Sequence, residues 1–164
     1  MKTIKKRRNQ NKTDYLKRLK LLKGETPRLV FRKTNRYIVA QYTKSQAAQD
    51  QIVIGITSRN LLEYGWPKEF EGSLKSITAS YLTGFLIGKK IIDKKMEAPI
   101  LDIGMTRSIA KSKIYSFAKG VIDSGVKMNC DKKMFPEEDR IKGKSLKKDF
   151  TKNFETIKSN ILKK

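Results

Sequence analysis

The chain has 164 residues, of which 38 are Lys or Arg and 16 are Asp or Glu, and it carries a formal net charge of +22. That length predicts one domain with a modest core and polar extensions, and that charge favours a polyanionic partner, either a nucleic acid or an anionic membrane surface. The sequence has no His and only one Cys, which excludes an internal disulfide and nearly excludes a zinc site. No apolar run approaches the roughly 20 residues of a membrane-spanning helix, and no secretory signal is recognisable at the basic N-terminus. We therefore expect a cytoplasmic protein with no membrane partner.

The charge is concentrated at the N-terminal end. Residues 1–36 hold 14 of the 38 Lys and Arg but only two acids, a net of +12. Residues 5–8 are all basic, and such blocks stay disordered until a polyanion neutralises them. Taken alone, this block is explained equally well as a solvated tail without function, but the segments that follow it favour binding.

A short amphipathic helix is predicted next. Asp14 is a suitable N-cap residue, Tyr15, Leu19 and Leu22 recur at helical spacing, and Gly24 offers a stop. Basic residues fall mainly between the apolar positions. This helix is therefore expected to dock on a core while presenting cations outward.

Residues 28–33 alternate apolar and basic side chains, a pattern that is typical of a strand. Leu29 and Phe31 are predicted to face the core, and Arg28 and Arg32 to point away from it on the opposite face. Replacing both arginines with Glu is accordingly expected to leave the fold nearly intact, because exposed charges contribute little to stability.

Two further strands are predicted after a hairpin turn at residues 34–35. The second strand spans residues 37–42, a polar loop covers residues 44–50, and residues 52–56 place Ile at alternate positions in a third strand. Because strands that follow one another along the chain usually pair, an antiparallel meander is expected.

Two helices and a short strand are predicted in the second half of the chain. Residues 74–93 repeat apolar side chains every three or four positions, and Gly84 and Gly88 form a notch for close packing. Residues 100–104 predict a short strand ending in a turn, and residues 113–124 predict a second helix. Together these elements indicate an α/β fold, in which helices cover a mixed sheet made of an antiparallel meander plus a further strand.

The composition changes after Cys130. Residues 131–164 hold 11 basic and six acidic side chains. An apolar seam at helical spacing runs through them: Leu146, Phe150, Phe154, Ile157 and Ile161. It predicts a C-terminal helix that docks on a partner or becomes ordered only in a complex. We divide the chain into a basic RNA-binding arm with a short helix (1–26), an α/β core domain (27–130) and a basic, partly helical C-terminal tail (131–164).

Catalytic chemistry has little support. The sequence contains no glycine-rich phosphate loop. Asp14, Asp102 and Asp123 could hold magnesium for a nuclease, but they lie on different predicted elements, and Asp102 is better explained by hydrogen bonds to the backbone at its strand end. Without an acid–base constellation, we expect no enzymatic activity, no cofactor, no metal and no small-molecule substrate.

The residues predicted to contact RNA combine cations with a few amide and tyrosine side chains. They are Lys5, Lys6, Arg7, Arg8, Lys12, Tyr15, Arg18, Lys20, Lys23, Arg28, Arg32, Lys33, Asn35, Arg36, Gln41, Arg107, Lys111 and Lys113. Arginines can bind a phosphate through two N–H groups at once. The amides can hydrogen-bond to base edges or 2′-hydroxyls, and the tyrosine can stack on bases. Any one of them alone is as well explained as a solvated surface group, and Trp66, which could also stack on a base, is better explained by packing. RNA is favoured over DNA because no helix-turn-helix, zinc-finger or zipper pattern is present.

The sequence resembles a known family. Residues 12–41, KTDYLKRLKLLKGETPRLVFRKTNRYIVAQ, are similar to the N-terminal signature of the archaeal and eukaryotic-type large-subunit ribosomal protein that binds 5S rRNA, the universal large-subunit protein eighteen family. ASYLTG at residues 79–84 and LDIG at residues 101–104 follow the same family pattern. The likeness covers about residues 5–145, and the short tail after Gly143 favours the archaeal form.

This resemblance implies a mixed α/β domain with a basic N-terminal extension. It also implies a structural role, in which the protein binds 5S rRNA and attaches it to the 23S-type rRNA in the central protuberance of the large subunit, beside neighbouring ribosomal proteins. The positions that match RNA-facing positions of the family are Lys12, Tyr15, Arg18, Arg28, Arg32, Lys33, Asn35 and Arg36. The alternatives are an RNA-binding ribosome assembly factor of the same fold and, from another functional class, a magnesium-dependent nuclease.

Overall fold

The structure is a computed structural model of the chain, and it describes residues 3–144 and 150–163. At its centre is a four-stranded sheet in the order β3-β2-β1-β4. The strands are β1 (Arg28–Lys33), β2 (Ile38–Gln46), β3 (Gln49–Thr57) and β4 (Ile100–Asp102). β2 pairs antiparallel with both β1 and β3, whereas β4 pairs parallel with β1. The predicted mixed sheet, an antiparallel meander plus a further strand, is confirmed.

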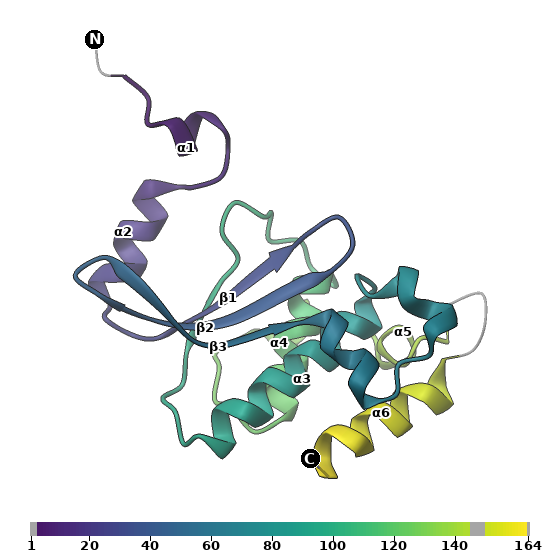
Figure 1. The fold of residues 1–164 in the computed structure, drawn as a ribbon. Helices are drawn as coiled ribbons and strands as arrows, with labels where there is room; N and C mark the ends of the chain where they lie inside the picture. The colour runs from purple at the N-terminus through teal and green to yellow at the C-terminus, as the bar shows by residue number, and fades with distance from the viewer. Residues whose placement is uncertain (1–2, 145–149, 164) are drawn as a thin grey trace.

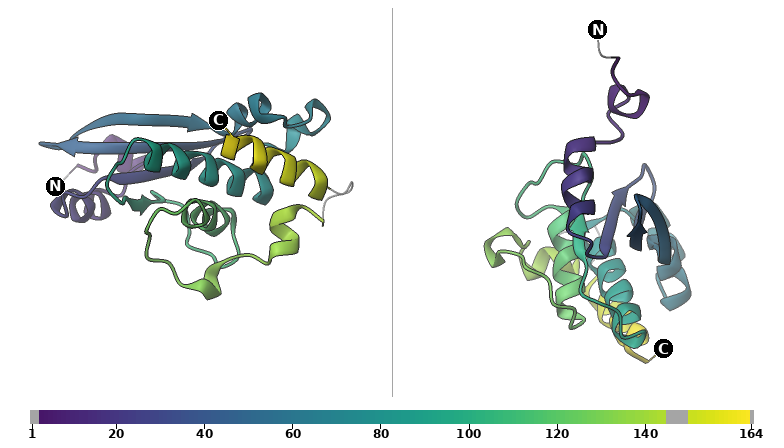
Figure 2. Two further views of the ribbon diagram at one scale, coloured as in Figure 1. Left: turned by 90° about the horizontal axis from the view of Figure 1, so that it is seen from below. Right: turned by 90° about the vertical axis from the view of Figure 1, so that its left-hand side faces the viewer.

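Helices cover one face of this sheet (Figures 1 and 2). The α-helices are α1 (Lys6–Asn9), α2 (Tyr15–Lys23), α3 (Ile77–Asp93), α4 (Lys113–Asp123), α5 (Glu138–Lys142) and α6 (Thr151–Lys163). Three short 3-10 helices are η1 (Ser58–Tyr64), η2 (Lys68–Ser73) and η3 (Lys132–Met134). α3 and α4 pack together on the sheet and α6 lies against α3 and η1, whereas α2 lies beside the sheet and α1 projects away from the rest of the molecule.

The core lies between the sheet and the α3–α4 pair. Leu29 and Phe31 are buried as predicted, and the Phe31 ring lies 5.1 Å from that of Phe117 in α4, measured between centroids. A Cβ on Gly84 would collide with the backbone carbonyl of Phe117, and a Cβ on Gly88 with the side chain of Ser124 just after α4. The predicted glycine notch is confirmed, and its occupant is α4. Each glycine costs about 1 kcal/mol of helix propensity, which close packing of the two backbones offsets.

The polar loop predicted at residues 44–50 is wrong. β2 continues to Gln46 and β3 starts at Gln49, so only Ala47 and Ala48 connect them, with φ angles of 47° and 65°. Positive φ at both central residues gives the turn a twist that suits a two-residue hairpin. Alanine is an unusual residue for that backbone conformation, and the sequence therefore carries no turn signal here.

The C-terminal helix docks on the chain's own core. Phe150, Phe154, Ile157 and Ile161 of the predicted seam are buried, whereas Leu146 lies outside the described residues. The Phe150 ring lies 4.6 Å from that of Trp66, which is itself buried and donates its ring N–H to the carbonyl of Phe70. The packing interpretation of Trp66 is confirmed. Docking of the seam on a partner is wrong, because this chain already covers it, and the division into arm, core domain and tail stays a prediction.

Candidate nucleic-acid interface

The N-terminal arm, α1 and α2, carries many exposed cations, and its α1 end projects from the body of the protein (Figure 1). Asp14 caps α2 as predicted, since its carboxylate accepts hydrogen bonds from the backbone N–H groups of Leu16 and Lys17 at 3.0 and 3.2 Å. The exposed cations predicted here are Lys5, Lys6, Arg7, Arg8, Lys12, Lys20 and Lys23. Tyr15 is half-buried, and the ammonium of Lys5 lies 4.5 Å from its ring centroid. The arm thus offers many point charges with one aromatic ring among them.

Polar contacts rather than apolar packing attach α2 to the sheet. No side chain of α2 is buried, and Leu16 is 65% exposed. Instead, the Lys17 ammonium donates to the carbonyl of Gly104 at 3.3 Å, and the Arg18 guanidinium donates to Asp50 at 2.9 Å. The prediction that this helix docks on the core is wrong, because the part of the body that it meets offers carbonyl and carboxylate oxygens.

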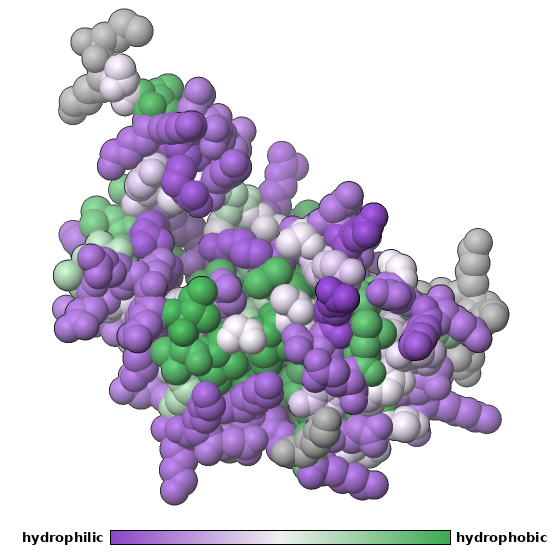
Figure 3. Space-filling view, in the orientation of Figure 1, coloured by the Kyte–Doolittle hydropathy of each residue, from purple (hydrophilic) through white to green (hydrophobic). Residues whose placement is uncertain are grey.

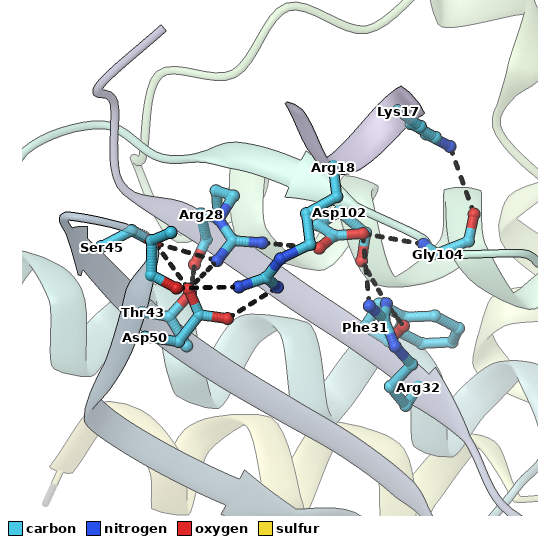
Figure 4. Close-up of polar contacts among 11 residues, drawn as sticks. Lys17, Arg18, Arg28, Phe31, Arg32, Thr43, Ser45, Asp50, Asp102 and Gly104 are labelled. Carbon is cyan, nitrogen blue, oxygen red and sulfur yellow. Dashed lines mark hydrogen bonds and ion pairs between the residues drawn. The ribbon is translucent and has the colours of Figure 1, made fainter. Parts of the chain in front are cut away.

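Arg28 does not point to solvent. Its side chain is only 3% exposed, and the guanidinium donates to Asp102 at 3.1 Å, to Asp50 at 2.6 Å and to Ser45 at 2.9 Å (Figure 4). The prediction that Arg28 is an exposed cation is wrong, and the expectation that replacing Arg28 and Arg32 with Glu leaves the fold nearly intact loses its basis. It does lie on the opposite face from Leu29, but there it meets acids of β3 and β4 that neutralise it.

Asp102 joins the end of β4 to β1. Its carboxylate accepts a hydrogen bond from the backbone N–H of Gly104 at 2.8 Å, which confirms the predicted backbone contact at the strand end. It also forms ion pairs with Arg28 at 3.1 Å and with Arg32 at 3.3 Å, which the sequence did not predict. The Arg32 side chain is 43% exposed, so unlike Arg28 it is open to solvent.

Asp50 is held in its ionised form. Burial alone would raise its pKa, but hydrogen bonds from Arg18, Ser45 and Arg28 outweigh burial and lower the pKa to about 2. Asp50 therefore stays negative at neutral pH and links α2 to the β2–β3 hairpin and to β1 (Figure 4).

The predicted turn between β1 and β2 carries further candidates. Lys33, Asn35 and Arg36 are exposed there. The turn is closed by Thr34, whose N–H donates to the carbonyl of Tyr37 at 2.8 Å and whose hydroxyl accepts from the N–H of Tyr37 at 2.9 Å. Gln41 lies further along β2 and is half-buried.

A second cationic group forms where this turn meets the start of α4. Arg107 and Lys111 are exposed and Lys113 is half-buried. Burial, followed by the nearby charges of Lys33 and Lys75, lowers the pKa of Lys113. Lys75 was not predicted as a site residue: it falls within the helix predicted at residues 74–93, whereas in the structure it lies just before α3. The fold thus joins cations from three distant parts of the chain.

Hydrophilic side chains dominate the surface seen in Figure 3 and cover the arm, while hydrophobic surface gathers over the sheet. Within residues 3–144 and 150–163, no helix combines the length and apolarity needed to cross a membrane. Nor does this part of the chain bring together three or more His, Cys, Asp or Glu in a way that could hold a metal ion. The chemistry that these residues do bring together is the presentation of cations to an anionic partner.

Comparison with known proteins agrees with this surface. Residues 1–99 match the family described as ribosomal large subunit proteins 60S L5 and 50S L18. The large ribosomal subunit protein uL18 of Korarchaeum cryptofilum is 40% identical over 140 residues, covering 85% of this chain and 70% of the relative. The uL18 proteins of Methanosphaera stadtmanae and Methanococcoides burtonii are 38% and 35% identical, covering 86% and 95% of this chain and 71% and 91% of the relatives. The chain therefore belongs to the family of ribosomal large subunit proteins 60S L5 and 50S L18, in its archaeal form, and is a structural, non-catalytic component of the large ribosomal subunit.

Proposed function

We propose that this protein binds 5S rRNA and attaches it to the 23S-type rRNA in the central protuberance of the large subunit. As a large-subunit ribosomal protein it is cytoplasmic and has rRNA and other ribosomal proteins as partners. The single observation that carries the proposal is the N-terminal arm, α1 and α2, which carries many exposed cations and whose α1 end projects from the folded body (Figures 1 and 2).

The proposed contacts fall on the arm and on the β1–β2 turn. They are Lys5, Lys6, Arg7, Arg8, Lys12, Tyr15, Arg18, Lys20, Lys23, Arg32, Lys33, Asn35, Arg36 and Gln41, with Arg107, Lys111 and Lys113 as a separate group. The cations neutralise backbone phosphates and release counterions. Amide groups recognise bases or 2′-hydroxyls, and Tyr15 stacks on a base. Arg28 is left out because its guanidinium is buried between two carboxylates.

The salt dependence of 5S rRNA affinity tests this proposal. If the arm and turn neutralise about six to eight phosphates, log K falls with log salt at a slope near −4 to −7. Replacing Lys6, Arg7 and Arg8 with Gln is expected to make that slope shallower by about 2–3. The matched control replaces three exposed lysines outside the arm, Lys90, Lys94 and Lys127, with Gln.

The control separates specific contacts from total charge, because both triple variants lose three positive charges. Equal losses of affinity would show that net charge, and not the arm, drives binding. A wild-type slope shallower than about −2 would refute the arm as the main contact. The wild-type protein is also expected to copurify with intact large subunits after a wash in high salt, whereas release from mature subunits would favour an assembly factor.

A further inference from the structure

A cavity of about 280 Å³ lies where the end of β1, the start of α3 and the loop before α4 meet. Among the described residues, five cations line it and no acidic side chain does: Lys33, Arg107, Lys111, Lys113 and Arg140. Sequence reasoning selected four of these cations separately, from the turn after β1 and from the loop before α4, and it missed Arg140. Only the fold joins them around one space.

Most of this positive charge is not ion-paired within the described part of the chain. Lys111 pairs with the exposed carboxylate of Glu137 at 2.8 Å. Among the described residues, the other four cations form no ion pair. Lys113 is half-buried, and burial together with the charges of Lys33 and Lys75 lowers its pKa. An anion in the cavity would relieve this repulsion and offset the desolvation of Lys113.

The start of α4 also borders this space. The 11-residue helix α4 begins at Lys113, and its first backbone N–H groups have no acceptor within the helix. Ser112 occupies the N-cap position without making the usual side-chain cap. Its hydroxyl is buried and, within the described part of the chain, has no hydrogen-bond partner, although Ser112 lines the cavity. A buried hydroxyl without a partner is unfavourable, and a ligand with several acceptor oxygens would satisfy it together with the helix N–H groups.

Apolar side chains complete the wall of the cavity. Ile77 and Ile109 line it, and Ile109 is 60% exposed. A free inorganic anion gains nothing from such a wall, whereas the sugar of a nucleotide can pack against it. We propose that this cavity binds one backbone phosphate of an RNA strand, held by Lys33, Lys113 and the Ser112 hydroxyl. The inference rests on the proposed RNA-binding function and adds to it a defined phosphate site apart from the arm.

Inorganic phosphate is the first probe. Titrated into the full-length ¹⁵N-labelled protein, it is expected to shift the amide signals of residues 112–115 in a saturable way. Ser112→Ala is expected to weaken that binding several-fold while leaving the free protein as stable as wild type, because the hydroxyl has no partner to lose. Lys33→Met/Lys113→Met is expected to abolish the shifts, and Lys90→Met/Lys94→Met, which removes two exposed lysines elsewhere, is expected to keep them. Shifts that persist in the Lys33→Met/Lys113→Met variant would overturn the site.

RNA is the second probe, and it separates this site from the arm. Lys33→Met/Lys113→Met is expected to lower 5S rRNA affinity about tenfold and to make the salt slope shallower by about 1, as for the loss of one phosphate contact. If this variant binds RNA like wild type while the Lys6/Arg7/Arg8 variant does not, the cavity inference fails and the proposed function stands. If wild-type protein fails to bind 5S rRNA, the proposed function fails. If an acidic peptide shifts residues 112–115 and an RNA oligonucleotide does not, the cavity is a protein-docking site and the inference is overturned.

Discussion

Arg28→Met is expected to destabilise the folded state strongly, although Arg28 lies within the most basic part of the sequence. The substitution keeps a long unbranched side chain and removes the guanidinium that joins Asp102 and Asp50 at 3.1 and 2.6 Å. Asp102 is left nearly buried, with a side chain that is 8% exposed, and retains one ion pair, to Arg32 at 3.3 Å. The expected loss of folding stability is therefore that of breaking a buried ion pair, reduced by the contact that Asp102 keeps with Arg32.

The magnitude follows from what is left behind. Removing one partner of a buried ion pair costs about 3–5 kcal/mol, because the remaining charge stays desolvated and uncompensated. The surviving contact with Arg32 and the partial exposure of Asp50 place this case near the lower end, at about 3 kcal/mol. For a chain of this size, about 1 kcal/mol corresponds to roughly 2–4 °C in Tm, so Tm is expected to fall by about 6–12 °C.

Urea unfolding followed by circular dichroism measures this loss. Arg36→Met makes the same chemical change at an exposed position of the turn and is expected to alter the free energy of unfolding by less than about 0.5 kcal/mol. Arg28→Met/Asp102→Asn is expected to be less destabilised than the sum of its single variants, because the uncompensated carboxylate is gone. If Arg28→Met is as stable as Arg36→Met and loses RNA affinity instead, the buried role of Arg28 is refuted.

Three further predictions concern the body of the protein. Gly84→Ala is expected to lower the free energy of unfolding by about 1–3 kcal/mol, because its Cβ would collide with the carbonyl of Phe117. The matched control is Gly72→Ala, whose Cβ meets nothing within 4 Å, and equal stabilities of the two variants would contradict the close packing at Gly84. In the folded state Asp50 has a pKa of about 2, below its ordinary 3.8. Its contribution to the free energy of unfolding is therefore complete above about pH 4 and is lost as the pH falls toward 2. Asp50→Asn is therefore expected to cost about 2 kcal/mol at pH 6 and progressively less below pH 4 in urea unfolding, and a cost independent of pH would argue against the ionised network. Ile157→Ala is expected to cost about 2–5 kcal/mol by calorimetry or urea unfolding, and wild-type stability would mean that α6 does not pack on the core.

The elements that the sequence predicts well are those whose evidence is local. α3 was predicted at residues 74–93 and spans Ile77–Asp93, and α4 was predicted at residues 113–124 and spans Lys113–Asp123. In both helices the apolar side chains repeat every three or four residues, so neighbouring positions alone specify the buried face. The glycine notch could be predicted for the same reason, although its partner helix could not.

The predictions that failed depend on contacts between distant parts of the chain. The alternation along β1 correctly places Leu29 and Arg28 on opposite faces of the sheet. It does not predict which residues cover the face that carries Arg28. Asp50 and Asp102, which neutralise Arg28, lie 22 and 74 positions further along the sequence. The cavity before α4 escaped prediction as a unit for the same reason, since its cations come from separate elements and only the fold brings them together.

The two arginines that bind Asp50 differ in exposure, and on the proposed function only the exposed one, Arg18, contacts RNA. Arg28 is buried and fixes β1 against β3 and β4, so a ligand that recruited it would leave carboxylates unpaired inside the protein. Arg18 and Asp50 are 32% and 31% exposed as a pair, and exposed pairs contribute only about 0–1 kcal/mol. An RNA phosphate that takes Arg18 leaves Asp50 with Arg28 and Ser45 as hydrogen-bond partners. On the proposed function, RNA can therefore take Arg18 from its exposed contact with Asp50 while the buried contacts of Arg28 keep the sheet intact.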